Sequence, residues 1–351
     1  MTPRQRVFAA MAGEMPDHVP FCIWNNKLPG GEINQRLLSL DTCIINKSTV
    51  YQVCMPEVKV EVEEAFDFGD FTRKHITYHT PAGDLTEIKR ITEHTVWAEK
   101  MAFSGPEDYE TLEALIKSKT YTPCYEDFQQ DDQAYGEQSI ARPTTILSPI
   151  QEIIYHYMGI ERFCIEWAER KEHLLHLCDV VAEDRRKRLK LLAASPALYG
   201  IIEANIAPEI WGMERFQKYC IPYIEEACDI LHAHHKWAGA HLDGNNRMLA
   251  PLVAKTSLDF IESFTPPPDC DLSLREARQI WSKKTILLNF PSSVHLRGPK
   301  QVKELACQIL HEAAPGDRFV FGVSENIPGR GLNTLVPLAR LVHEKGRTPL
   351  T

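Results

Sequence analysis

The most constraining feature of this sequence is a series of five consecutive strand–loop–helix units in its second half. Each unit opens on a short apolar run and continues into a segment with helical periodicity; the five runs are ALYGIIEAN, KWAGAHLDG, SLDFIESF, TILLNFPSS and RFVFGVSEN. Strands that are apolar throughout, joined by connections long enough for a helix, are typical of a parallel sheet buried on both faces. No G-x-G-x-x-G follows any of them, which favours a (β/α)8 TIM barrel over a dinucleotide-binding sheet.

The first half of the chain is less regular. VPFCIWNN predicts a first strand, and TTILSPIQEIIYHYMG predicts a strand that leads into a helix. Between them, residues 66–103 alternate apolar and polar side chains around Pro81-Ala82-Gly83, which predicts an antiparallel hairpin or small meander near an end of the barrel. We therefore predict one barrel domain over residues 1–351, with an antiparallel excursion at about 66–103.

Composition and charge narrow the function classes. The 351 residues are 44% hydrophobic and carry a formal net charge of −9, which argues against nucleic acid and anionic membranes as partners. No stretch approaches the roughly 20 apolar residues of a membrane span, and the N-terminal residues are too polar for a signal peptide. None of the ten cysteines forms a Cys-x-x-Cys pair. We therefore expect a cytoplasmic protein in a reducing compartment.

Polar side chains gather where the predicted strands end, and in such barrels chemistry collects at the carboxyl ends of the strands. Burying many charged side chains on one rim costs free energy, so we expect them to have a function. We predict substrate binding by Trp24, Asn25, Asn26, Asn205 and Asn289, and proton transfer by Glu203 or Glu262. Further polar rim residues are His241, Asp243, Thr265, Ser324 and Glu325.

The stretch AHLDGNN (240–246) places an imidazole and a carboxylate two residues apart at the end of an apolar run. Side chains at i and i+2 of a strand share a face, so His241 and Asp243 can act together. With Glu325 from the last strand they form a ligand set suited to Zn²⁺, and equally to Fe²⁺, Mn²⁺ or Co²⁺. Spacing alone leaves open the alternative that Asp243 accepts a backbone hydrogen bond and Glu325 caps a loop.

Four stretches, in order, resemble the uroporphyrinogen decarboxylase superfamily, whose members are single (β/α)8 barrels. They are TPRQRVFAAMAGEMPDHVPF, SPIQEIIYHYMGIERF, APEIWGMERFQKYCIPYIEEACDILHAHH and HLDG, and the similarity extends over nearly the whole chain. The decarboxylases proper grip the substrate propionates with an arginine-rich N-terminal stretch. The corresponding FCIWNNKLPGGE holds no arginine, so the sequence is more similar to the methyltransferase-like branch.

That branch binds zinc through a His-x-Cys pair followed by Gly and a further Cys three residues before a Pro. Here the pair position reads His241-Leu-Asp243-Gly244, and the third position, before Pro328, reads Glu325. The resemblance thus implies a divalent metal, Zn²⁺ first, held by oxygen in place of sulfur and therefore more Lewis-acidic. It implies transfer of a methyl group from a small methylated substrate, an O-methyl compound foremost, to cobalamin carried by a separate corrinoid protein.

A second hypothesis is that the same rim and metal belong to a decarboxylase or lyase that acts on a small carboxylated compound. A sensor or binding barrel is disfavoured by the density of carboxylates on the rim. The expected partners are a small methylated substrate and a corrinoid protein, without nucleic acid or membrane; a homodimer is left open.

Overall fold

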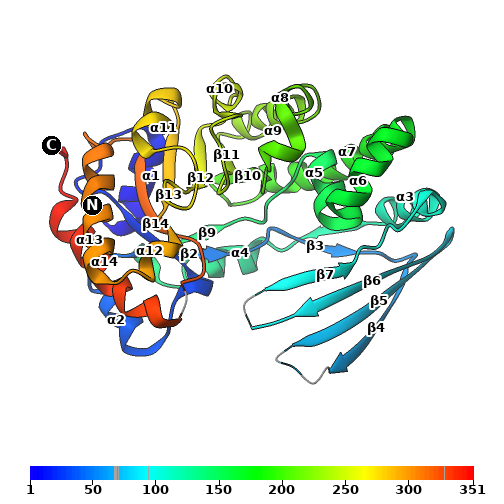
Figure 1. Cartoon of the computed structure of the whole chain (residues 1–351), viewed down its shortest axis with the longest axis horizontal. Helices are drawn as coiled ribbons and strands as arrows, with labels where there is room; N and C mark the ends of the chain where they lie inside the picture. The colour runs from blue at the N-terminus through cyan, green and yellow to red at the C-terminus, as the bar shows by residue number, and fades with distance from the viewer. Residues whose placement is uncertain (67–68, 70, 94, 328) are drawn as a thin grey trace. The chain divides into compact units, whose positions relative to one another are not determined.

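The computed structural model describes residues 1–66, 69, 71–93, 95–327 and 329–351 (Figure 1). These residues form two compact units. The barrel unit consists of Met1–Val50, Cys124–Ile146 and Leu192–Thr351, and the meander unit consists of Tyr51–Pro123 and Leu147–Leu191. That the whole chain forms one domain, as we predict from the sequence, stays a prediction.

The barrel unit is built on an 8-stranded sheet in which every pair of neighbours is parallel. Its order is β10-β11-β12-β13-β14-β1-β2-β9. After β9, the Ile146 N–H donates to the Ile201 carbonyl of β10 at 2.9 Å, which brings the two ends of this order together. The predicted (β/α)8 barrel is confirmed. The strands are β1 (Phe21–Trp24), β2 (Cys43–Lys47), β9 (Ser139–Arg142), β10 (Tyr199–Ala204), β11 (Trp237–His241), β12 (Phe260–Phe264), β13 (Thr285–Asn289) and β14 (Phe319–Val323).

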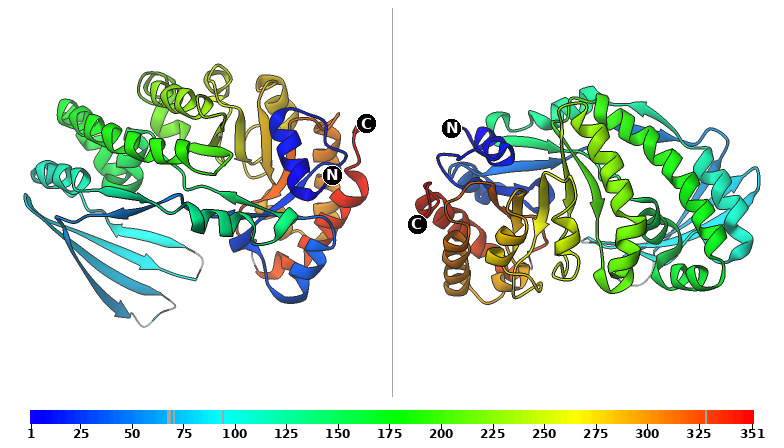
Figure 2. Two further views of the ribbon diagram at one scale, coloured as in Figure 1. Left: turned by 180° about the vertical axis from the view of Figure 1, so that it is seen from behind. Right: turned by 90° about the horizontal axis from the view of Figure 1, so that it is seen from above.

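Helices follow the strands in the order that the five predicted units require. In α11, Ser273 and Glu276 form a capping box that satisfies backbone donors at the start of the helix. The helices α13 and α14 pack against each other, as Figure 2 shows. The helices of this unit are α1 (Pro3–Ala12), α2 (Gly31–Leu38), α4 (Tyr125–Asp132), α8 (Pro208–Tyr219), α9 (Ile221–His232), α10 (Ala250–Val253), α11 (Leu274–Ile280), α12 (Ser292–His295), α13 (Pro299–Glu312) and α14 (Leu335–Lys345).

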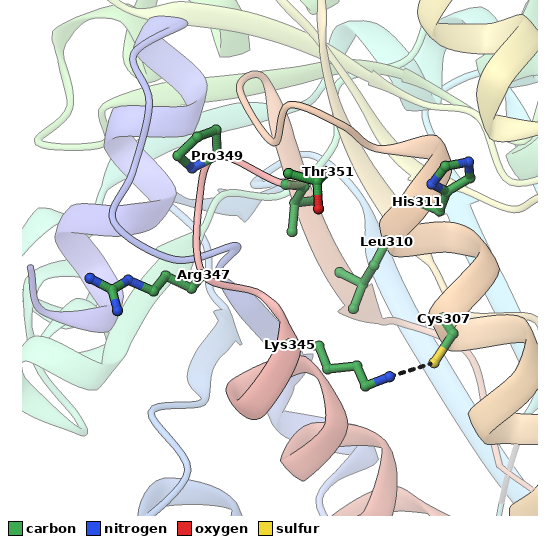
Figure 3. A pocket seen from close by; sticks show the side chains of 8 residues that line it. Cys307, Leu310, His311, Lys345, Arg347, Pro349 and Thr351 are labelled. Carbon is green, nitrogen blue, oxygen red and sulfur yellow. Dashed lines mark hydrogen bonds between the residues drawn. The ribbon is translucent and has the colours of Figure 1, made fainter.

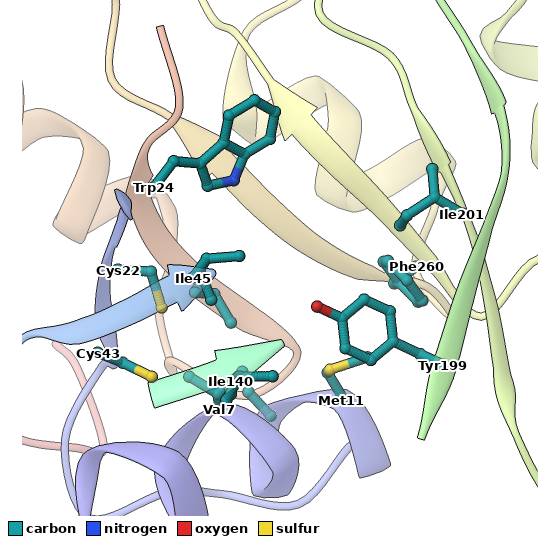
Figure 4. Close-up of a cluster of buried hydrophobic side chains, with 12 residues drawn as sticks. Val7, Met11, Cys22, Trp24, Cys43, Ile45, Ile140, Tyr199, Ile201 and Phe260 are labelled. Carbon is teal, nitrogen blue, oxygen red and sulfur yellow. The ribbon is translucent and has the colours of Figure 1, made fainter. Parts of the chain in front are cut away.

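The helix α1 packs against the amino-terminal end of the barrel. The Thr285 hydroxyl, on the first residue of β13, donates to the carbonyl of Ala10 at 2.9 Å. Val7 and Met11 join a buried cluster with inward side chains of the strands (Figure 4). Because the interior is filled by side chains, as in other barrels of this type, the opposite, carboxyl-terminal end is left for chemistry. The cluster also includes Cys22, Trp24, Cys43, Ile45, Ile140, Tyr199, Ile201, Phe260 and Val320.

The meander unit holds a 4-stranded antiparallel sheet in the order β4-β5-β6-β7, drawn side by side in Figure 1. The predicted antiparallel insertion is confirmed, but it extends from Lys59 to Lys100 instead of 66–103; positions 67, 68, 70 and 94 lie outside the described residues. The strands are β3 (Tyr51–Cys54), β4 (Lys59–Phe66), β5 (Thr72–Thr80), β6 (Gly83–Ile91), β7 (Val96–Lys100) and β8 (Thr120–Pro123), with β3 paired to β8. The helices are α3 (Tyr109–Lys117), α5 (Pro149–Glu152), α6 (Gly159–Glu169) and α7 (Lys171–Ala194), with a π-helix at Ile153–Met158.

Two further features concern the cysteines and the lengths of the helices. All ten cysteines lie in the described part of the chain, and each is a free thiol. Of the helices that the structure describes, none is both long enough and apolar enough to cross a membrane.

Candidate functional site

His241 is the last residue of β11 and is buried at the carboxyl end of the barrel. Its Nδ1 lies 2.9 Å from Oε2 of Glu262, and its Nε2 lies 3.4 Å from Oδ2 of Asp243. The backbone between His241 and Asp243 is held in place, because the Leu242 N–H donates to the carbonyl of Glu262 at 3.0 Å. The structure therefore brings His241 and Asp243 together, as their spacing predicts, and adds Glu262 from the neighbouring strand.

Glu262 is held by an arginine that the sequence analysis missed. Arg142, the last residue of β9, donates from Nε to Oε1 at 2.8 Å and from Nη2 to Oε2 at 2.7 Å, and both side chains are buried. This two-pronged contact is the strong geometry for a guanidinium and a carboxylate. Arg142 could have been found as the charged residue that ends the short apolar run SIAR, which is β9.

The environment sets the charges of this group. Burial opposes a charge on His241, but hydrogen bonds to Asp243 and Glu262 outweigh it and raise the pKa of His241 to about 9. Burial likewise opposes a charge on Glu262, but Arg142 and the bond from His241 lower the pKa of Glu262 to about 2. At neutral pH His241 is therefore an imidazolium between two carboxylates. An ionised Glu262 does not fit the predicted role of proton donor; its contacts make it the residue that orients His241.

Trp24, at the end of β1, is 9% exposed and lies beside this group. Its ring centroid is 5.5 Å from that of His241, 5.2 Å from Cζ of Arg142 and 4.0 Å from Nζ of Lys47. Cations at these distances are attracted by the indole ring. The ring face of Trp24 is thus surrounded by positive groups from β2, β9 and β11.

The sequence analysis also missed two lysines near the end of β1. Lys47 ends the neighbouring strand β2, and burial, aided by Arg142 and Lys27, lowers the pKa of Lys47 to about 8. The ammonium of Lys27 donates to Oδ1 of Asn326 at 2.5 Å. Their signal in the sequence was their position, because each lies just where an apolar run stops.

The two asparagines predicted to bind substrate after β1 differ in their surroundings. Oδ1 of Asn25 accepts from the backbone N–H of Asn26 at 2.9 Å and lies 3.5 Å from the backbone nitrogen of Lys47. Asn25 therefore links the ends of β1 and β2. Asn26 is exposed. Substrate binding by either residue stays a prediction.

Asn289 is fully buried at the end of β13 and organises the end of β14. Its Nδ2 donates to the Thr265 hydroxyl at 3.1 Å, and its Oδ1 accepts from the backbone N–H groups of Ser324 at 2.9 Å and Glu325 at 3.3 Å. The Ser263 hydroxyl donates to that of Ser324 at 2.8 Å. Asn289 therefore positions the backbone of Glu325, and its predicted contact with substrate stays a prediction.

Glu203 lies in β10 where its register with β11 shifts, between Ile201 and Ala204. Its carboxylate accepts from the Ala204 N–H at 3.1 Å and from the thiol of Cys220, at the α8–α9 junction, at 3.3 Å. The structure thus joins Glu203 to Cys220. Asn205 follows, exposed and with a positive φ of 53°. The predicted roles of Glu203 in proton transfer and of Asn205 in substrate binding stay predictions.

Two cavities in the barrel unit differ in size and in place. A small one of about 30 Å³ is lined by Trp24, Tyr199, Glu262 and Ser324. A larger one of about 330 Å³ lies between α13 and the last residues of the chain, where Nζ of Lys345 is 3.7 Å from the sulfur of Cys307 (Figure 3). The Leu350 N–H donates to Pro315 just before β14, so this cavity is at the amino ends of the strands, where barrels of this type do not place their chemistry.

The separation of His241 and Asp243 is compatible with a shared metal ion as well as with their direct contact. Two ligand atoms on a tetrahedral Zn²⁺ are about 3.4 Å apart when the metal–ligand distances are about 2.05 Å, and Nε2 of His241 lies 3.4 Å from Asp243. A carboxylate on Nδ1 is the usual partner of a zinc-bound histidine, and Glu262 fills that place. Within the described ranges, no group of three His, Cys, Asp or Glu side chains is assembled around one point. The third ligand, Glu325, therefore stays a prediction.

No family model and no curated protein matches this sequence. Among solved structures, the chain is similar to a methyltransferase from Methanosarcina mazei. The likeness has a TM-score of 0.62 at 12% identity, and it covers 98% of this chain and 99% of that one. At this identity the likeness extends to the fold, and it agrees with the (β/α)8 barrel described above.

Proposed function

We propose that this protein is a methyltransferase, which moves a methyl group from a small O-methylated compound to cob(I)alamin carried by a separate corrinoid protein. The observation that supports it most directly is the His241–Asp243 pair at the carboxyl end of β11, with Glu262 on Nδ1 of the imidazole. The whole-length likeness to a methyltransferase barrel and the sequence resemblance to the methyltransferase branch of the uroporphyrinogen decarboxylase superfamily point the same way.

We further propose that His241, Asp243 and Glu325 hold a divalent ion, with Zn²⁺ first. When bound, the ion supplies a Lewis acid that polarises the ether oxygen of the substrate. Glu262 accepts the Nδ1–H of His241 and so directs Nε2 toward Asp243, and Arg142 keeps Glu262 ionised. Because the pKa of His241 is raised to about 9, metal binding must displace a proton, and metal affinity should rise with pH.

In the proposed reaction the bond between the methyl carbon and oxygen breaks, and cob(I)alamin supplies the electron pair for the new carbon–cobalt bond. The departing oxygen takes one proton and leaves as an alcohol. We propose Glu203 as the group that delivers this proton, as expected for general acid catalysis. Trp24 and Asn25, at the end of β1, are the residues proposed to contact the body of the substrate.

The experiment follows the absorbance of cob(I)alamin while methoxylated compounds and methylamines are supplied with the protein. Wild type should convert cob(I)alamin to methylcobalamin with a methoxylated donor. Asp243→Ala and Glu325→Ala should abolish the conversion, whereas the control Glu304→Ala, on the exposed face of α13, should not. Circular dichroism checks that each variant is folded. Wild-type rates in Asp243→Ala would contradict the proposal.

A second candidate is a decarboxylase or lyase that acts on a small carboxylated compound. The observation that favours it is the presence of two lysines, Lys27 and Lys47, near the end of β1. If no donor yields methylcobalamin, yet a carboxylated compound releases CO₂ in a step that needs His241, this second function is the correct one.

A further inference from the structure

The meander unit contains a cavity of about 300 Å³, and every residue that lines it belongs to that unit. The strands β3, β5, β6 and β8 contribute to its walls, together with α3, α5, α7 and the π-helix at Ile153–Met158. The volume corresponds to roughly ten water molecules and lies at the lower end of the range of small-molecule sites. The function proposed above leaves this cavity without a role.

Four tyrosines line the cavity, and they form walls of fixed aromatic rings. The Tyr78 hydroxyl donates to Oε1 of Glu87 at 2.6 Å, and the Tyr121 hydroxyl donates to Oδ2 of Asp184 at 2.7 Å. The rings of Tyr51 and Tyr121 meet edge to face, with their centroids 5.3 Å apart. Such walls favour a ligand with a planar, apolar body, because aromatic rings pack well in stacked and edge-to-face arrangements.

The carboxylates at this cavity are already neutralised by basic side chains. Glu87 and Glu152 line it and are both 5% exposed, and Asp184, which binds the Tyr121 hydroxyl, is 2% exposed. A cationic ligand would therefore compete with the cations that these carboxylates already bind. The pairs are Lys89 with Glu87 at 2.8 Å, Arg188 with Glu152 at 2.6 Å and Lys187 with Asp184 at 3.6 Å.

Lys119, between α3 and β8, lines the same cavity and differs from these cations. Its Nζ donates to the hydroxyl of Tyr157 and lies 5.1 Å from the centroid of that ring. Among the residues that the structure describes, Lys119 forms no ion pair with a carboxylate. Burial lowers the pKa of Lys119, although Glu152 and Asp184 oppose this effect through space. An ammonium has three donors, so a partly desolvated group with two donors to spare is left for an anion.

The π-helix places a second unused polar group beside the same phenol. His156 and Tyr157 both line the cavity, and their ring centroids are 6.3 Å apart. Over the described ranges, the imidazole of His156 forms no hydrogen bond or ion pair with another side chain. Helical turns of this type are rare and are frequently found at functional sites. The imidazole is thus available to a ligand that Lys119 holds beside Tyr157.

We propose that this cavity binds a small organic anion with a single negative charge and a planar, apolar body. The negative group accepts from the spare donors of Lys119, and the body packs against the rings of Tyr51 and Tyr121. One unpaired ammonium sets the charge at one, since the other basic side chains are paired with carboxylates. The inference goes beyond the proposed methyl transfer and does not depend on it, because the lining belongs to the meander unit.

Binding can be measured by isothermal titration of the wild-type protein with benzoate, benzamide, benzylamine and phenyl phosphate, which share a ring and differ in charge. We expect benzoate to bind at least tenfold more tightly than benzamide, and benzylamine to bind most weakly. Phenyl phosphate should bind no more tightly than benzoate. Lys119→Gln should weaken benzoate by roughly tenfold or more, the usual effect of a charge-assisted hydrogen bond, and leave benzamide unchanged.

The matched control is Lys117→Gln, two positions away at the end of α3. Lys117 is 62% exposed and pairs with Glu113, so its replacement should change none of the affinities. Lys119→Arg keeps the positive charge and should bind benzoate more tightly than Lys119→Gln does. Circular dichroism checks that each variant is folded.

Equal affinity of the wild-type protein for benzoate and benzamide would overturn the proposal, whether or not the variants fold. Wild-type affinity for benzoate in a folded Lys119→Gln variant would overturn it as well. Tighter binding of phenyl phosphate than of benzoate would contradict the single charge. If benzoate, cinnamate and indole-3-acetate all fail to bind below about 10 mM, the cavity is not a site for anions of this class.

Discussion

Replacing Glu262 by Gln should destabilise the protein far more than the loss of an ordinary surface charge. Glu262 accepts three contacts from Arg142, at 2.7, 2.8 and 3.1 Å, and one from His241 at 2.9 Å. The side chains of Arg142 and Glu262 are only 8% and 4% exposed. Glutamine leaves the guanidinium buried without its counter-charge, and breaking a buried pair from one side costs about 3–5 kcal/mol. We expect a loss of this size in the free energy of unfolding, measured by urea denaturation at pH 7 with chelator present.

The matched control is Glu276→Gln. Glu276 pairs with Arg247 at 2.8 and 3.0 Å, in similar geometry, but these side chains are 41% and 53% exposed. Glutamine also keeps the capping interaction with Ser273, so only the exposed ion pair is lost. Such an exposed pair contributes little to stability, because water screens it. The double variant Arg142→Met/Glu262→Gln should recover at least about 1 kcal/mol relative to the sum of the single changes. A Glu262→Gln variant as stable as Glu276→Gln would refute the reasoning.

Two further expectations concern pH and proton transfer. The pKa of His241 is raised from 6.5 to about 9. Its contribution to the stability of chelator-treated protein is therefore complete below about pH 6.5 and is lost as the pH rises through 9. The pKa of Glu262 is lowered from 4.5 to about 2, so its contribution is present above about pH 4.5 and is lost as the pH falls through 2. The free energy of unfolding, from urea denaturation, should fall between pH 6 and 10 by an amount on the order of 3 kcal/mol or less, and His241→Gln should flatten that fall. If Glu203 donates the proton, Glu203→Gln should slow methyl transfer by about 10²–10⁴-fold without releasing metal; an unchanged rate would leave Glu203 as a structural partner of Cys220.

The barrel could be predicted from the sequence because its signal is repeated. Each of the five units has an apolar run long enough for a strand and a periodic segment long enough for a helix, so a mistake in one unit does not change the architecture. The His241–Asp243 pair was also accessible, because the two residues are only two positions apart, although β11 ends at His241 and Asp243 lies in the loop that follows. The start of the meander could not be predicted in this way. In Lys59–Phe66 valine alternates with charged residues, yet most of these side chains remain exposed.

Arg142, Lys27 and Lys47 were missed for a different reason. Their importance depends on which strands become neighbours: β2 lies between β1 and β9, although more than 90 residues of chain separate the ends of β2 and β9. Arg142 reaches Glu262 over 120 positions of sequence. A charged residue at the end of one short run carries no such information by itself. It acquires a partner only when the barrel closes and brings the two edges of the sheet together.

The two buried carboxylates show how a local backbone irregularity decides the use of a residue. Glu203 and Glu262 both lie near the end of an apolar strand, and the sequence gives no reason to treat them differently. Each lies at a register shift, and a shift of one residue exchanges the two faces of a strand. Glu203 bonds to Cys220 at the junction of two helices, whereas Glu262 bonds to Arg142 and His241. Ser263, held at a φ of 58° directly after Glu262, supports this turn of the chain through its bond to Ser324. Because bulges cluster beside active sites, the irregularity in β12 is itself an argument that Glu262, and the histidine it orients, belong to the functional centre.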